Sequence, residues 1–128
     1  MNMHLTQTIA EVMDSGVVIV HNRFSIEKAL GLAKGQHLII VQGERPVGVL
    51  TTEMQGLMAH HSGFLNELAF PTPLIARSEA DLLSFYRDHR ANLTPVVVVN
   101  AQGTIAGIVV QNQLITQLLK ILEEREAF

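Results

Sequence analysis

The sequence contains no cysteine. This absence excludes disulfides, thiolate metal sites and cysteine nucleophiles, and it fits the reducing environment of the cytoplasm, where we expect the protein to be. Long hydrophobic runs are also missing, since the longest is roughly Pro95–Val99 and a membrane helix needs about 20 apolar residues. The first residues lack the basic start and apolar run of a secretory signal. We therefore expect a soluble protein without a membrane partner.

Charge is scarce as well. Charged residues make up 16% of the 128 residues, against about 25% in an average soluble domain. The formal net charge is −3 and the nine basic residues are scattered, so the basic patch that nucleic-acid binding requires is missing. Hydrophobic residues make up 48%. With so few charges on a small body, we expect a partner to cover part of the apolar surface, and the simplest such partner is a second copy in a homodimer.

The sequence also lacks the common catalytic motifs. It has no G-x-x-x-x-G-K-[ST], G-x-G-x-x-G, H-E-x-x-H or G-x-S-x-G, and its acidic residues are dispersed, with no pair placed for acid and base catalysis. The six histidines do not have the spacing of metal ligands, because the adjacent His60 and His61 would point about 100° apart on a helix. We therefore expect no catalytic site and no metal site.

What the sequence does contain is one order of elements, strand–helix–strand–strand–helix, that occurs twice after a short lead-in helix. The periodicity of apolar residues and the cap residues Ser25, Thr52 and Ser78 predict these elements. The expected elements are Thr8–Met13, Val17–Val20, 26–34, Leu38–Val41, Val47–Thr51, a helix after Thr52, Phe64–Phe70, Leu74–Ala76, a helix after Ser78, Thr94–Asn100, Ile105–Val110 and Asn112–Arg125. Gly48 and Gly107 hold matching places in the last strands. The predicted fold class is α/β (α+β), with repeats over residues 1–62 and 63–128.

The two copies resemble the cystathionine-β-synthase-type (CBS) domain, of which a tandem pair forms a Bateman module. The first copy is carried by TIAEVMDSGVVIV, SIEKAL and QHLIIVQGERPVGVLTTEM, and the second by FLNELAFPTPLIA, SEADLLSFY and LTPVVVVNAQGTIAGIVVQNQL. The resemblance implies two βαββα repeats related by a pseudo-two-fold axis. It also implies a cleft between them for an adenosine-containing ligand such as AMP, ADP, ATP or S-adenosylmethionine. Such modules dimerise, regulate an attached or partner effector protein, and are not enzymes.

The family's [ST]-x-x-D motif is incomplete in both copies. In that motif the hydroxyl lies near the phosphates and the carboxylate grips the ribose hydroxyls. The first copy keeps Thr51 but has Met54 in place of the aspartate, and the second copy has Val110 and Gln113. Losing such a charge-assisted hydrogen bond costs ~1.5–3 kcal/mol, or roughly one to two decades in affinity. A second hypothesis therefore stays open, in which the chain is a ligand-free dimerisation or docking module with degenerate nucleotide sites.

Eight residues are candidates for binding the ligand, and several of them have a structural interpretation as well. They are Thr51, Thr52, Met54, Arg77, Thr94, Pro95, Val110 and Gln113. Thr52 can simply cap the following helix while Thr51 ends a strand, and proline is tolerated at the first residue of a strand. Arg77 follows a strand and can be a solvated loop residue. The closing helix has a broad apolar stripe, which favours a dimer seam over a helix buried on its own module or a helix that leads into a further domain.

Overall fold

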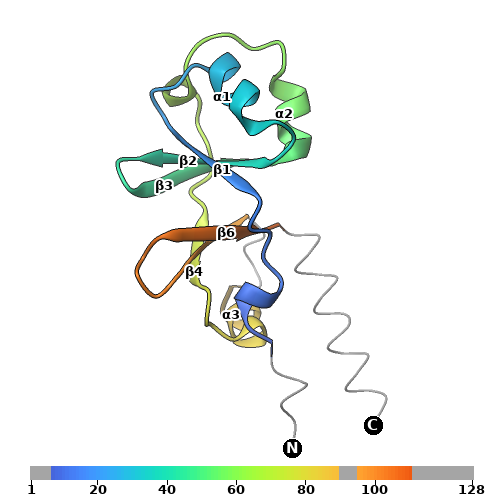
Figure 1. Cartoon of the computed structure of the whole chain (residues 1–128), viewed down its shortest axis with the longest axis vertical. Coiled ribbons are helices and arrows are strands. Elements are labelled where there is room, and N and C mark those ends of the chain that lie inside the picture. The colour runs from blue at the N-terminus through green and yellow to red at the C-terminus, as the bar shows by residue number, and fades with distance from the viewer. Residues whose placement is uncertain (1–6, 90–94, 111–128) are drawn as a thin grey trace, which may run out of the picture. The chain divides into compact units, whose positions relative to one another are not determined.

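The computed structural model describes residues 7–89 and 95–110, which fall into two compact units (Figure 1). Unit 1 consists of Met1–Ser15 and Leu74–Phe128, and unit 2 consists of Gly16–Pro73. In chain order the elements are η2 (Ile9–Glu11), β1 (Val17–His21), α1 (Ile26–Ala33), β2 (His37–Gln42), β3 (Arg45–Leu50), α2 (Thr52–Met58), η3 (Leu65–Glu67), β4 (Leu74–Arg77), α3 (Leu82–His89), β5 (Val96–Val99) and β6 (Ile105–Val109). No described helix is long and apolar enough to cross a membrane.

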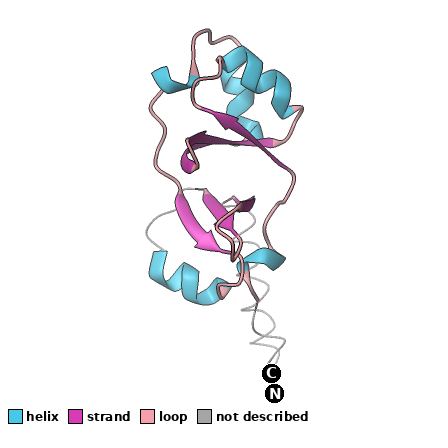
Figure 2. Ribbon diagram, turned by 60° about the vertical axis from the view of Figure 1, so that its left-hand side comes forward, coloured by secondary structure: helices cyan, strands magenta, loops and turns pink. Residues whose placement is uncertain are grey.

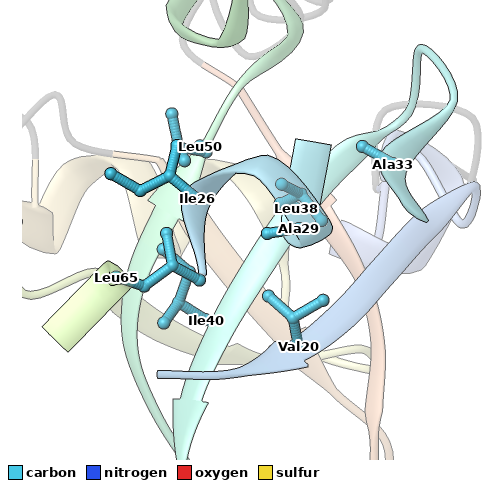
Figure 3. Close-up of a cluster of buried hydrophobic side chains, with 8 residues drawn as sticks. All are labelled: Val20, Ile26, Ala29, Ala33, Leu38, Ile40, Leu50 and Leu65. Atoms are coloured by element: carbon cyan, nitrogen blue, oxygen red, sulfur yellow. The ribbon is translucent and has the colours of Figure 1, made fainter. Parts of the chain in front are cut away.

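Unit 2 is built on a three-stranded sheet with the order β1-β2-β3. Strand β1 runs parallel to β2, and β3 runs antiparallel to β2. Helix α1 packs on this sheet because its apolar residues recur at three- and four-residue spacing and form one buried stripe. Figure 3 shows the resulting core, in which the side chains of α1 meet those of the strands and of η3. Its buried members are Val20, Ile26, Ala29, Ala33, Leu38, Ile40, Leu50 and Leu65.

The start of α1 is fixed as the sequence predicts. The Ser25 hydroxyl accepts a hydrogen bond from the backbone N–H of Lys28 at 3.1 Å, which satisfies one of the free donors in the first turn. Lys34 ends the helix in the left-handed conformation with φ of 49°, and Gly35 follows with φ of 84°. These two residues let the chain turn directly into β2.

Unit 1 repeats the same architecture (Figure 2). Its sheet has the order β4-β5-β6, again with one parallel and one antiparallel pair. The two sheets also share their strand register. Ile40 faces Gly48 in one sheet, Val98 faces Gly107 in the other, and the register shifts directly after each of these pairs. The matching places of the two glycines are therefore confirmed, as is the α+β fold class with two similar repeats. The apolar run at the start of β5 is buried on both faces, as its sequence predicts.

Two of the three predicted helix caps are wrong. Ser78 does not cap a helix, because α3 begins four residues later and the Asp81 carboxylate accepts the N–H of Ser84 at 2.9 Å. The N-cap of α2 is Thr51 and not Thr52. Gln55 forms no capping box with the start of α2, because its side-chain amide donates to the carbonyl oxygens of Gln36 and Leu50.

The lead-in segments are exchanged between the repeats. Ile9 donates its backbone N–H to Ala80 at 2.9 Å and its side chain is buried in the core of unit 1. Leu65 donates to Phe24 at 3.0 Å and is buried in the core of unit 2. Each lead-in segment therefore packs on the sheet of the other repeat. The compact units of the structure consequently differ from the two sequence repeats, which meet between residues 62 and 63. The linear boundary stays a prediction about the sequence repeats.

A glycine in the last strand of each sheet lets the lead-in segment approach closely. A Cβ atom at Gly107 would lie 2.6 Å from the carbonyl oxygen of Asp14, and one at Gly48 would lie 2.8 Å from the Cβ of Phe70. Asp14 also exchanges two backbone hydrogen bonds with Ile108, at 2.8 and 3.0 Å. The absence of a side chain is therefore what allows this backbone pairing.

We expect Gly107→Ala to lower the free energy of unfolding by about 1–3 kcal/mol, because the new methyl group must push the Asp14 backbone away from β6. Urea unfolding followed by circular dichroism measures the change. Gly56→Ala is the matched control, since a Cβ there meets nothing within 4 Å and alanine favours the helix by up to about 1 kcal/mol. Equal stability of the two variants would contradict the close approach.

We also expect Ile9→Ala to destabilise the protein by about 2–5 kcal/mol although it lies near the N-terminus. Its side chain is 1% exposed and belongs to the core of unit 1, so truncation leaves a cavity. Glu11→Ala is the control, since Glu11 is exposed. If Ile9→Ala changed the unfolding free energy by less than 0.5 kcal/mol, as roughly expected for a surface position, the docking of this segment would be wrong.

Candidate functional site

Three of the candidate residues lie at one end of the sheet of unit 2. Thr51 follows β3 and is half-buried, while Thr52 opens α2 and is exposed. The Thr51 Oγ1 accepts the N–H of Met54 at 3.4 Å, so its own hydroxyl proton is available for another acceptor. The structure therefore brings Thr51 and Thr52 together at a strand end, as the sequence predicts.

Met54 has a structural role in the same place. Its half-buried side chain packs against the core of unit 2, together with Met58 one turn later. A thioether is only a weak hydrogen-bond acceptor, so this position offers no substitute for a carboxylate. Met54 therefore contacts the core at the position where the resemblance implies a carboxylate.

The sequence analysis missed His37 at this end of the sheet. Its Nδ1 accepts the backbone N–H of Thr52 at 3.0 Å, and the register places it next to Thr51 because Leu38 faces Leu50. Gln55 reinforces the same junction by donating to the carbonyl oxygen of Gln36 at 2.7 Å. A single histidine forms no motif that would indicate such a contact. The only signal in the sequence was that His37 stands directly before an apolar strand, which places it at a strand end.

The candidates of unit 1 divide between the two ends of its sheet. Val96 faces Val109, so Pro95 and Val110 lie at the same end, at the places that His37 and Thr51 occupy in unit 2. Both are half-buried. Neither side chain can donate or accept a hydrogen bond, so this end is apolar where the corresponding end of unit 2 is polar.

Arg77 lies at the opposite end of this sheet from Pro95 and Val110, since β4 runs parallel to β5 and Arg77 faces Val99. The structure thus separates it from the other candidates of its unit. Its guanidinium donates to the Glu79 carboxylate at 2.5 Å, and this hydrogen bond is the main cause that lowers the pKa of Glu79. Both side chains are more than half exposed, so the pair is a surface ion pair that contributes little to stability.

The remaining candidates, Thr94 and Gln113, lie outside the described residues, as does the predicted closing helix. Within the described ranges no group of three histidine, aspartate or glutamate side chains is placed to hold a metal ion.

Comparison with known proteins identifies the fold of this chain. No model of a protein family matches the sequence, and no curated protein matches it either. Solved structures do match the backbone. CBSX2 of Arabidopsis thaliana in complex with AMP is 24% identical, with a TM-score of 0.59 over 89% of this chain and 97% of that chain.

Two further solved structures have the same fold. The CBS domain of the bacterial CNNM/CorC family Mg²⁺ transporter in complex with ATP is 17% identical, with a TM-score of 0.64 over 88% of this chain and 87% of that one. The CBS domain pair of protein MJ0100, in complex with 5′-methylthioadenosine and S-adenosyl-L-methionine, is 19% identical, with a TM-score of 0.64 over 90% and 97%. Together with the repeated sheet register, these likenesses show that the chain has the fold of a tandem CBS domain pair.

Proposed function

We propose that the chain is a regulatory module that binds an adenosine-containing ligand, dimerises, and signals to an attached or partner protein without catalysing a reaction. The observation that carries this proposal is the shared fold: CBS pairs with this architecture have been solved with AMP, with ATP, and with 5′-methylthioadenosine and S-adenosyl-L-methionine. Fold alone does not fix a ligand, so the proposal also rests on the polar strand end of unit 2.

The polar strand end offers a hydroxyl group for such a ligand. Thr51 uses an oxygen lone pair for the N–H of Met54, which leaves its proton for a phosphate or ribose oxygen. The N–H of Thr52 is already bound to His37, so it is not a spare donor. With Met54 in place of a carboxylate, we expect weaker binding than a complete [ST]-x-x-D motif gives.

A second candidate function is a docking or dimerisation module that binds no nucleotide. Three positions favour this function: Met54, which packs against the core, and Pro95 and Val110, which form the apolar strand end of unit 1. Each was expected to contact the ligand, but none has a side-chain group that recognises ribose or phosphate. In this alternative the fold serves only to present surfaces to a partner.

Calorimetry on the chain and its Met54→Asp variant separates these two functions. The variant restores the missing carboxylate, so we expect it to bind AMP about ten- to a hundredfold more tightly than the unchanged chain, which corresponds to a charge-assisted hydrogen bond of ~1.5–3 kcal/mol. AMP, ADP, ATP and S-adenosylmethionine are titrated into both proteins.

Met54→Leu is the matched control, because leucine keeps the apolar contact and adds no acceptor. We expect its affinity to equal that of the unchanged chain. If neither the chain nor Met54→Asp gave heat with any of the four ligands at millimolar concentration, the nucleotide-binding function would be wrong and the docking function would remain.

We expect the chain to sediment as a homodimer, with twice the mass of one chain. The scarcity of charge supports this expectation, as does the exposed apolar side chain of Leu57, which is 78% exposed on α2. Analytical ultracentrifugation over a hundredfold range of concentration measures the mass. A monomer at the highest concentration would rule out dimerisation as part of the function.

A further inference from the structure

Unit 2 contains a groove that the proposed function does not use. It has a volume of about 540 Å³, within the range of small-molecule sites. One wall is a side of α1 that carries Glu27, Leu30 and Gly31, which share a face because they are spaced by three and four residues. The other wall is the connection from α2 to η3, residues 59–63.

The two walls are tied together, so the groove is formed without a ligand. Ile26, at the start of α1, donates its N–H to the carbonyl oxygen of Gly63 at 2.9 Å. At the other end of the connection, His61 donates its N–H to the carbonyl oxygen of Met58 at 3.0 Å. Backbone hydrogen bonds thus hold residues 59–63 at both ends of the wall.

The groove has one formally charged side chain at neutral pH, the Glu27 carboxylate. It forms no ion pair with another described residue. The adjacent cation, Lys28, lies with its Nζ 4.6 Å from the centre of the Phe24 ring and not against Glu27. The facing wall includes His60 and His61, and a neutral imidazole has a lone pair that can accept a hydrogen bond.

We propose that this groove binds a small organic amine. An ammonium group donates hydrogen bonds and carries positive charge, which matches a carboxylate and imidazole lone pairs. The methylene groups of such a ligand would lie along Leu30 and beside Gly31, where no side chain fills the space. A metal ion does not fit, because no three of the described histidine and acidic side chains are placed to hold one.

The test uses 1,6-diaminohexane, with uncharged 1,6-hexanediol as its matched compound, and follows the amide resonances of Gly31 and Gly63 in the full chain by NMR. We expect the diamine to shift both resonances in a saturable manner and the diol not to shift them. Glu27→Gln should weaken the diamine at least about tenfold, since it removes the charge. Glu53→Gln, which removes an exposed carboxylate from the first turn of α2, should leave binding unchanged.

A pair of glycine variants separates binding from folding. Gly31→Leu fills the groove, and a Cβ there meets nothing within 4 Å, so we expect it to fold at least as stably as the original while the diamine no longer shifts Gly63. Gly56→Leu makes the same change in α2, outside the groove, and should bind normally. The proposal is wrong if the diol shifts the resonances equally, or if Glu27→Gln or Gly31→Leu binds the diamine as well as the original. None of these experiments uses a nucleotide, so their failure would leave the proposed nucleotide-binding function untouched.

Discussion

The structure depends on a close passage of the chain over one glycine in each sheet. Phe70 crosses at Gly48 and the Asp14 backbone crosses at Gly107, at separations too short for a Cβ atom unless the crossing segment shifts. Through these passages the lead-in segment of each repeat joins the sheet and core of the other. Each unit is consequently built from residues that are far apart in the sequence, and neither repeat contains all of its own core.

The sequence was sufficient for the features that depend on local patterns. The Ser25 cap, the buried stripe of α1 and the apolar run of β5 follow from spacing and residue type. Ser78 shows where such reasoning fails. Serine is a common N-cap residue, but here the helix starts only after Asp81. The carbonyl oxygen of Ser78 instead accepts the N–H of Ala10 from the lead-in segment. That hydrogen bond joins residues 68 positions apart in the sequence, and no local pattern reports it.

The candidate site divides in the same way. The correspondence between Thr51 and Val110 was visible because both end the last strand of a repeat, and the register agrees. The candidates Arg77 and Pro95 lie at opposite ends of the sheet, because β4 and β5 run parallel and Arg77 faces Val99. His37 escaped notice since its contact to Thr52 depends on the turn from β3 into α2, which brings together residues 15 positions apart.

Two sheets with one register carry different chemistry at the same end. In unit 2 that end presents the hydroxyl of Thr51 and the imidazole of His37. The Nδ1 atom of this imidazole already accepts the backbone N–H of Thr52 in α2. In unit 1 the corresponding places hold Val110 and Pro95, and neither side chain can form a hydrogen bond. Because polar ligands are recognised through hydrogen bonds, the side chains at these two strand ends differ in what they can offer such a ligand, even though the two backbones are alike. Of these two strand ends, only that of unit 2 therefore offers a side-chain hydroxyl to a polar ligand.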